Sequence, residues 1–393
     1  MKILLVHNFY QSSSPSGEDT VFKNEVELLK ENGIEVITYE NYNDDALSLN
    51  KIRLGFRTIW SKETYKDLRD LIKKEKPDIA HFHNIWYLIS PSAYYACKDA
   101  GVPVVQTLHN FRLFCVNGLL LRKGKVCEDC LRKVPWRGAI RGCYRNSIFY
   151  SAPVALTEFI HKVIGTWNDN VNAYIALTEF GREKYIEGGL PAEKIFVKPN
   201  FLAHPPEPSF NHKDYAVFLG RLSLEKGLWT LIEAWKEIKG ITLKVMGDGP
   251  LRKDLEDFVS KYRIENIEFT GKKEFNDCME LLKGSLFMIM PSVWYETFGI
   301  SVIEAFACGK PVIASRLGAM AELVEDYKTG LLFEHGNPED LAEKIRWMLD
   351  NEEACIEIGR NARAEFEAKY TAEKNFEISM EIYKKTIENK GNG

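Results

Sequence analysis

The sequence predicts an α/β protein built from two doubly wound parallel-sheet domains. Short apolar, β-branched runs alternate with amphipathic helical patterns along most of the 393 residues, and this alternation is typical of parallel sheets. It stops in the stretch 200–214, which contains three prolines, and then starts afresh. A chain of this length suits two domains of about 150–200 residues. We expect two Rossmann-like domains that face each other across a cleft, with ligands at the carboxyl ends of the strands.

The first predicted domain covers residues 1–205. Its expected elements are, in order, a strand at KILLVHNF, a helix at 20–31, and strands at EVITYE, PDIAHFHN, VPVVQTLHN and AYIALT. The first apolar run spans only Ile3–Val6 before a histidine, so we expect a buried strand and not an export signal. Because no run of about eighteen uncharged apolar residues occurs either, a cytoplasmic protein is expected.

A basic, cysteine-rich insertion is expected at about 110–167. Nine residues from Arg112 to Arg145 are basic, whereas only Glu128 and Asp129 are acidic. Such a block suits a phosphate-bearing acceptor or an anionic membrane, although it could also be a solvated face. The insertion contains Cys115, Cys127, Cys130 and Cys143. A Cys-x2-Cys pair flanked by two further cysteines predicts a structural zinc outside the catalytic step, with unligated thiols as the alternative.

The second predicted domain covers residues 206–371. Its expected strands are YAVFLG, ITLKVMG, IEFTG, LFMIMPS, KPVIAS and GLLF, with helices at 228–238 and 251–262 among them. The chain ends in helical patterns rich in Glu, Lys and Ala. We expect 372–393 to form a helix that crosses back to the first domain.

Two glycine-containing loops follow strands of this domain. In GRLSLEKG, Arg221 and Lys226 stand between glycines, and such cations suit a diphosphate; two unconnected surface cations are the alternative. The ending of a Walker A loop is missing. The loop MGDGP, which contains Gly247, predicts by itself only a tight turn before a helix.

The segment PSVWYETFGISVIEA (291–305) carries more information. A strand ends at Met290, a polar loop carries Glu296, and a helix begins near Gly299, where free amide groups would bind anions. Glu304 lies more than a turn inside this otherwise apolar helix, where a carboxylate is costly unless groups such as ribose hydroxyls satisfy it. The alternative is one capping and one surface glutamate.

Together these segments resemble the retaining glycosyltransferases of family 4 (group 1 type), which have the GT-B architecture. The order and spacing of the motifs match, and the likeness extends over nearly the whole chain. It implies that Arg221 and Lys226 neutralise the diphosphate of a nucleotide-sugar donor, and that Glu304 holds the ribose. It also implies a donor-binding role for Gly247.

The resemblance assigns further contacts with the donor sugar. Glu296 and the backbone amides of Phe298, Gly299 and Ile300 would orient the sugar and its proximal phosphate. His109 matches a family histidine near the donor sugar, although an Asn follows it here where the family often has Asp.

At the start of the chain, Ser16-Gly17-Glu18 occupies the position of a glycine-rich loop that is usually Gly-Gly in the family. Gly17 would therefore approach the phosphates, whereas Ser16 replaces the first glycine of the family pattern.

The chemistry implied is a metal-independent, retaining hexosyl transfer. Because no two aspartates are separated by a single residue, no Asp-x-Asp metal motif is present, and the cations at positions 221 and 226 would stabilise the leaving diphosphate. Three further histidines stand at strand ends near the predicted cleft: His7, His81 and His83. They are either structural polar residues or contacts for the substrate.

A glycan or lipid-linked acceptor in cell-surface polysaccharide synthesis is expected. The segment 47–62 mixes apolar and basic residues, so it either contacts an anionic membrane at its inner face or covers a core. The net charge of −4 argues against a general nucleic-acid binder. The alternatives are a GT-B-like sugar-nucleotide epimerase and, from another class, a zinc-containing nucleic-acid-binding protein.

Overall fold

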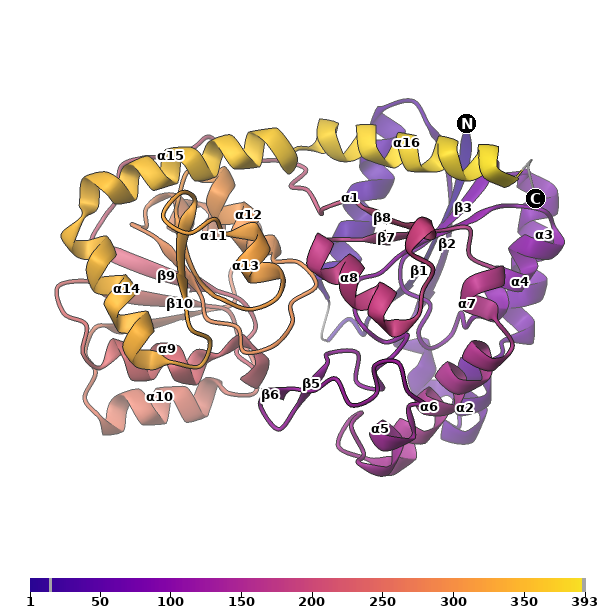
Figure 1. Cartoon of the computed structure of the whole chain (residues 1–393), viewed down its shortest axis with the longest axis horizontal. Helices are drawn as coiled ribbons and strands as arrows, with labels where there is room; N and C mark the ends of the chain where they lie inside the picture. The colour runs from indigo at the N-terminus through magenta and orange to yellow at the C-terminus, as the bar shows by residue number, and fades with distance from the viewer. Residues whose placement is uncertain (14–15, 391–393) are drawn as a thin grey trace. The chain divides into compact units, whose positions relative to one another are not determined.

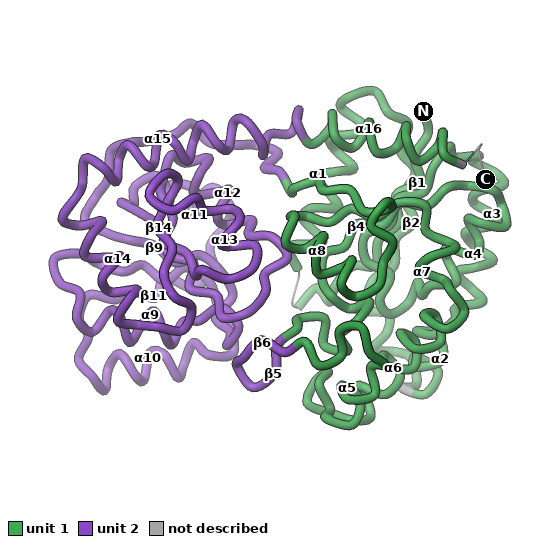
Figure 2. Tube along the Cα trace, in the orientation of Figure 1, with its two compact units in different colours: residues 1–120, 128–200, 375–393 green, residues 121–127, 201–374 purple. Residues whose placement is uncertain are grey.

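The computed structural model describes residues 1–13 and 16–390, and it divides into two compact units (Figures 1 and 2). Unit 1 comprises residues 1–120, 128–200 and those from 375 onward, and unit 2 comprises 121–127 and 201–374. The main division therefore falls at the start of the proline-rich stretch 200–214, and most of the last helix belongs to unit 1.

Unit 1 contains a six-stranded, entirely parallel sheet with strand order β2-β1-β3-β4-β7-β8. The strands are β1 (Lys2–Phe9), β2 (Glu35–Tyr42), β3 (Ile79–Phe82), β4 (Val104–Thr107), β7 (Ala173–Ala176) and β8 (Ile195–Val197). Central β1 pairs Leu4 with Ile37 on one side and with Ala80 on the other. Because helices cover both faces of such a sheet, its central strands are continuous apolar runs, which is the pattern in the sequence.

The helices of unit 1 include one from the end of the chain. They are α1 (Gly17–Glu31), α2 (Lys51–Ile59), α3 (Lys62–Glu75), α4 (Ser92–Asp99), α5 (Trp136–Ile140), α6 (Ile148–Val163), α7 (Thr166–Asp169), α8 (Glu179–Gly188) and α16 (Ala372–Lys390). Two short 3₁₀ turns, Asp45–Ser48 and Ala192–Lys194, complete the unit. Ile382 and Tyr383 of α16 pack in the same core as Ile3 and Phe22, so the end of the chain completes the first core.

The insertion at 110–167 is more ordered than the sequence predicts. It contains the antiparallel pair β5 (Leu121–Arg122) and β6 (Lys125–Val126), followed by α5 and the 16-residue helix α6. We did not predict α6, because it contains Pro153 and shows no polar face at helical spacing. No helix in the described parts of the chain has the length and hydropathy to cross a bilayer.

Unit 2 repeats the architecture with a parallel sheet of order β11-β10-β9-β12-β13-β14. Its strands are β9 (Tyr215–Leu219), β10 (Thr242–Met246), β11 (Ile267–Gly271), β12 (Met288–Met290), β13 (Val312–Ser315) and β14 (Gly330–Phe333). Its helices are α9 (Leu228–Trp235), α10 (Arg252–Lys261), α11 (Phe275–Lys283), α12 (Ile300–Ala307), α13 (Ala319–Leu323), α14 (Pro338–Asp350) and α15 (Glu352–Lys369), with a 3₁₀ turn at Leu224–Lys226. The prediction of two Rossmann-like α/β domains is confirmed.

Candidate active site

Three loops of unit 2 join at the carboxyl ends of β9, β10 and β12. The backbone N–H of Leu222, after β9, donates to the carbonyl of Asp248, after β10, at 3.0 Å. The N–H of Val293, after β12, donates to the carbonyl of Glu225 at 3.0 Å. The three segments that the sequence singled out separately are therefore held together along one edge of the sheet.

Two glycines make this close approach possible. Gly247 has a φ of +133°, and a Cβ there would lie 1.9 Å from the carbonyl oxygen of Gly220. Gly227 has a φ of +69°, and a Cβ would lie 1.8 Å from the carbonyl oxygen of Pro291. Any side chain at either position would separate the loops. Packing alone thus explains Gly247, and its contact with a donor stays a prediction.

Two of the predicted catalytic residues pair directly in this structure. The Lys226 ammonium lies 2.6 Å from Oε1 of Glu296, and the Ser292 hydroxyl donates to the same oxygen at 2.8 Å. Glu296 is only 6 % exposed, so the ammonium and the hydroxyl satisfy a carboxylate that is nearly out of water. The structure thereby brings together residues that stand 70 positions apart.

Arg221 has a different environment. It is exposed, and its guanidinium forms no ion pair with any residue in the described ranges. A guanidinium offers a planar set of donors that matches phosphate oxygens. Arg221 can therefore accept an anionic ligand without first giving up a protein partner.

Glu304 on α12 is partly buried, and no described residue donates a hydrogen bond to it. Burial raises the pKa of its carboxyl to about 7. At the start of the same helix, the first amide groups, including that of Ile300, have no partner inside the helix. Phe298 and Gly299 before them are buried, and the Phe298 ring lies 6.0 Å from the ring of Tyr370. The segment thus offers a ligand a carboxyl group and helix-start amides that are not hydrogen bonded to any described residue.

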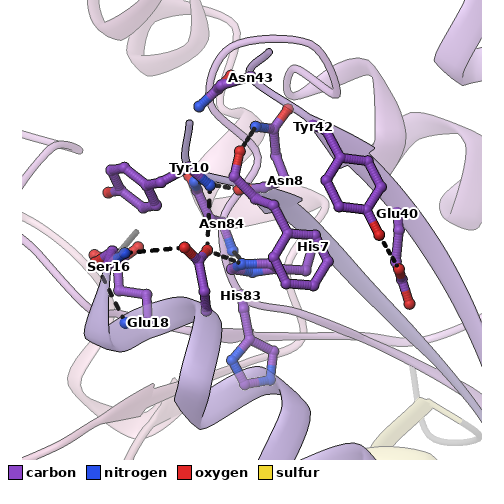
Figure 3. Close-up of polar contacts among 12 residues, drawn as sticks. His7, Asn8, Tyr10, Ser16, Glu18, Glu40, Tyr42, Asn43, His83 and Asn84 are labelled. Carbon is purple, nitrogen blue, oxygen red and sulfur yellow. Dashed lines mark hydrogen bonds and ion pairs between the residues drawn. The ribbon is translucent and has the colours of Figure 1, made fainter. Parts of the chain in front are cut away.

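In unit 1, α1 begins at Gly17, three residues before the predicted start, because Ser16 caps it. The Ser16 hydroxyl accepts from the Glu18 N–H at 3.3 Å, and Asp19 accepts from the Ser16 N–H at 3.0 Å. Figure 3 shows Ser16 and Glu18 at this helix start, with His7 and His83 nearby. Gly17 is exposed, so its backbone is open to a ligand. Residues 14 and 15 lie outside the described ranges.

His109 follows β4 and contacts another histidine. Its Nε2 lies 2.9 Å from Nδ1 of His83, and Tyr185 fixes the backbone by donating to the carbonyls of Leu108 and Asn110, each at 3.1 Å. Burial lowers the pKa of His109 to about 3, so the imidazole is neutral at physiological pH. It can exchange hydrogen bonds with a sugar but contributes no positive charge. The Asn110 side chain donates to Oε1 of Glu18 at 3.0 Å.

A buried network that the sequence analysis missed lies behind His109. Glu25 on α1 forms an ion pair with Lys198 at 3.0 Å, and the same oxygen lies 3.3 Å from Nδ1 of His81. Its second oxygen lies 3.6 Å from Nε2 of His83. Burial opposes ionisation of Glu25, but Lys198 and His81 outweigh it and hold the pKa of the carboxyl well below its usual range. The sequence did contain a signal, because Glu25 falls among the apolar residues Phe22, Leu28 and Leu29 of the buried face of α1.

Among the described residues, Glu25, His81 and His83 form the one group of three potential metal ligands within 4.8 Å of one another. The ammonium of Lys198 already neutralises Glu25, and both ring nitrogens of His81 are hydrogen bonded, to Tyr383 and Thr107, at 2.7 Å each. These contacts satisfy Glu25 and His81 without a metal, whereas Nε2 of His83 is buried without a hydrogen-bond partner among the described residues. Because Lys198 already neutralises the carboxylate, we assign the cluster a structural role. His7 is likewise bound, with Nε2 2.8 Å from Asp19.

The four cysteines of the insertion do not form such a group in the described structure. Zinc–sulfur bonds of about 2.3 Å would place the sulfur atoms roughly 3.8 Å apart. The Cys115 thiol instead donates to the Asn117 side chain at 2.9 Å, and burial raises its pKa to about 12. As they lie here, no three of the four thiols come within 4.8 Å of one another, so a tetrahedral zinc would require some of them to move.

Two Rossmann-like units, one of them carrying cations and carboxyl groups at its strand ends, define a transferase of the GT-B class. Comparisons with known proteins identify the family. Residues 16–203 match the model of "Glycosyltransferase Family 4", and residues 202–365 match that of "Glycosyl transferases group 1". The chain belongs to the family 4, or group 1, glycosyltransferases.

Relatives and solved structures agree with this assignment. An uncharacterized glycosyltransferase of Methanocaldococcus jannaschii is 28 % identical over 95 % of both chains. The D-rhamnosyltransferase WbpZ of Pseudomonas aeruginosa is 30 % identical over 40 % of this chain and 42 % of its own. The Anabaena protein HepE, solved in complex with UDP, superimposes with a TM-score of 0.69 at 20 % identity, covering 97 % of this chain and 99 % of that one. The GT-B fold is thus confirmed.

Proposed function

We propose that the protein transfers a hexose from a nucleotide-diphosphate donor to a glycan or lipid-linked acceptor with retention of anomeric configuration, in cell-surface polysaccharide synthesis. One observation carries the proposal. Unit 2 carries, at and beside its strand ends, the Lys226–Glu296 pair together with Arg221 and the Glu304 carboxyl, neither of which forms an ion pair with a described residue. The structures of the similar Anabaena protein with UDP and with UDP-glucose support a nucleotide-sugar donor.

In the proposed reaction, the bond between the anomeric carbon and the diphosphate oxygen breaks while the acceptor oxygen bonds to the same face of that carbon. The acceptor proton passes to the leaving phosphate oxygen. Arg221 and Lys226 stabilise the charge that develops on the diphosphate, so no metal is required. Glu304 accepts hydrogen bonds from the ribose.

The remaining contacts orient the sugar. Glu296 and the amides that precede and begin α12 bind its hydroxyls and its proximal phosphate. His109 contacts the same sugar as a neutral hydrogen-bonding group, and Gly17 approaches the phosphates. An epimerase would use the same donor contacts but would convert the sugar without releasing free nucleotide.

Two further expectations belong to this proposal. Peripheral contact with an anionic membrane at the cytoplasmic face would give access to a lipid-linked acceptor. A structural zinc in the cysteine-rich insertion stays a prediction. It is tested by measuring the zinc content of the purified wild type and of the Cys127→Ser variant.

The experiment that tests the proposal measures thermal stability with UDP, GDP, ADP and dTDP sugars. A ligand at ~100 times its dissociation constant adds roughly 2.7 kcal/mol to stability, which a melting shift detects. We expect one nucleotide class to stabilise the wild type but not Arg221→Ala. Arg316→Ala is the matched control, because Arg316 is an exposed arginine of the same unit whose guanidinium already pairs with Asp326 at 2.7 Å. Equal shifts in both variants would contradict the assignment of Arg221.

A further inference from the structure

The outer face of α6 is apolar, although helices on a solvated surface usually carry polar side chains there. Ile148, Phe149 and Leu156 are 61 %, 56 % and 37 % exposed, and Val163 near the end of the helix is 67 % exposed. Lys162 is the single exposed ionic residue of the helix. A face of this kind is expected to be covered by another apolar body.

The helices α2 and α5, which both contact α6 (Figure 1), also expose pairs of apolar side chains. On α2, Ile52 and Phe56 are 65 % and 70 % exposed, and on α5, Trp136 and Ile140 are 38 % and 72 % exposed. The members of each pair are four residues apart and therefore share one face of their helix. We call the exposed residues of 52–60, 134–141 and 145–164 the α2–α5–α6 surface.

The exposed ions of the α2–α5–α6 surface are all cations. They are Arg53, Arg137, Arg141, Arg145 and Lys162, of which Arg137 and Arg141 pair with Asp129 outside this surface. The one carboxyl group within these ranges, Glu158, is buried. An apolar, cationic surface complements an anionic bilayer. It opposes a second copy of itself, because like charges would face each other.

A pocket of about 80 Å³ opens within this surface between α2 and α6. Leu54 and Gly55 line it from α2, and Phe149 and Pro153 line it from α6. Gly55 lets the helices approach, since a Cβ there would lie 3.5 Å from the Pro153 ring. The volume matches about three water molecules, but the lining is mainly apolar, so a short segment of hydrocarbon fits it better.

Two arginines connect this pocket with a second one beside His109. The Arg145 guanidinium lies 5.5 Å and 5.7 Å from the ring centres of Tyr144 and Tyr150, which both line the α2–α6 pocket. The Arg112 guanidinium lies 5.2 Å from the same Tyr144 ring, and Arg112 and His109 together line the second pocket. Neither arginine has a carboxylate within ion-pair distance in the described parts of the chain.

We propose that the α2–α6 pocket is the acceptor-lipid site. The apolar chain of a lipid phosphate or diphosphate enters between α2 and α6, while Arg145 and Arg112 bind its phosphate. The rest of the lipid stays in the bilayer against the α2–α5–α6 surface. This inference rests on the proposed transfer function and names its acceptor, whose reacting end would reach the pocket beside His109.

The test is flotation of the full chain with vesicles of phosphatidylcholine that contain either polyprenyl phosphate or phosphatidylglycerol at equal negative charge. We expect stronger retention by the polyprenyl phosphate vesicles. Arg145→Gln and Gly55→Leu, which fills the pocket, should each weaken that retention by about tenfold or more. Gly55→Ala should not, and neither should Arg69→Gln, the matched control. Arg69 stacks on Tyr65 of α3 at 5.8 Å, outside this surface.

A competition experiment on the wild type tests the same site without any substitution. Soluble farnesyl phosphate should displace the protein from the vesicles, whereas inorganic phosphate should not. Equal retention by both anionic vesicles, together with unchanged binding of Arg145→Gln, would overturn the proposal and leave general adsorption to charged lipid. The donor-induced melting shift is measured on every variant. If the shift persists while lipid selectivity is absent, only the acceptor site fails; if the wild type shows no shift, the proposed function fails.

Discussion

Donor affinity should rise with pH because of one carboxyl group on α12. Burial raises the pKa of Glu304 to about 7, and no described residue donates a hydrogen bond to it. If two ribose hydroxyls donate to Glu304, only the ionised form accepts both, so donor binding expels the proton below pH 7. With a pKa of about 7, the apparent dissociation constant at pH 6 should be about tenfold weaker than at pH 8.

Titration calorimetry at pH 6, 7 and 8 measures this directly. The sugar nucleotide is the right ligand, because the terminal phosphate of a free nucleoside diphosphate titrates near pH 6 and would add its own pH dependence. Repeating the titration in buffers of different ionisation enthalpy counts the protons released. We expect about one at pH 6 and almost none at pH 8.

Glu304→Gln is the control for the titrating group. Its affinity should be lower than that of the wild type at pH 8 and nearly independent of pH. A carboxyl whose pKa is raised by folding stabilises the fold at low pH, and this contribution is lost as the pH rises through the folded pKa of about 7. The glutamine variant should therefore be no less stable than the wild type at pH 8. A flat wild-type profile, or a slope retained in the variant, would refute the ribose assignment.

Three other changes test separate parts of the molecule. Lys226→Ala should lower turnover on the order of 10²-fold, because it removes a cation from the leaving diphosphate; an unchanged rate in a steady-state assay would exclude that role. Lys198→Met should destabilise the protein by about 3–5 kcal/mol in urea unfolding, since the buried Glu25 would lose the ammonium that neutralises it, and adding Glu25→Gln should recover much of the loss. Burial raises the pKa of Glu158 well above its usual range, so Glu158→Gln should stabilise the protein at neutral pH and above, with little effect at pH 4.

The sequence predicted the strands of both parallel sheets except β8, because most of them are short apolar runs next to Pro, Gly or Asn. It missed β8, which has only three residues, and the two-residue strands β5 and β6. It did not predict α6. Helix recognition depends on a polar face, and Ile148–Val163 exposes apolar residues on the side where that face should be. The apolar outer face of α6 therefore explains both why the helix was not predicted and why we propose that it contacts lipid.

The candidate site was predicted residue by residue but not as a set of contacts. Lys226 and Glu296 were each named, yet their pairing depends on β9 and β12 being neighbours in the sheet, and strand order is not readable from a local pattern. The network around Glu25 is even harder to predict from the sequence. Its partner Tyr383 lies on α16, and their 3.2 Å contact joins residues 358 positions apart.

The Lys226–Glu296 pair suggests how the donor could be discriminated on the proposed assignment. A diphosphate that draws Lys226 away would leave Glu296, which is only 6 % exposed, with the Ser292 hydroxyl as its remaining donor. An underbonded buried carboxylate is unfavourable, so another donor must replace the ammonium. The hydroxyls of the donor sugar can do so, whereas a free nucleoside diphosphate has none at that position. Arg221, which has no protein partner to lose, can bind either ligand. Truncating Glu296 to Ala should therefore narrow the difference in affinity between the sugar nucleotide and the free diphosphate, while Arg221→Ala should weaken both alike.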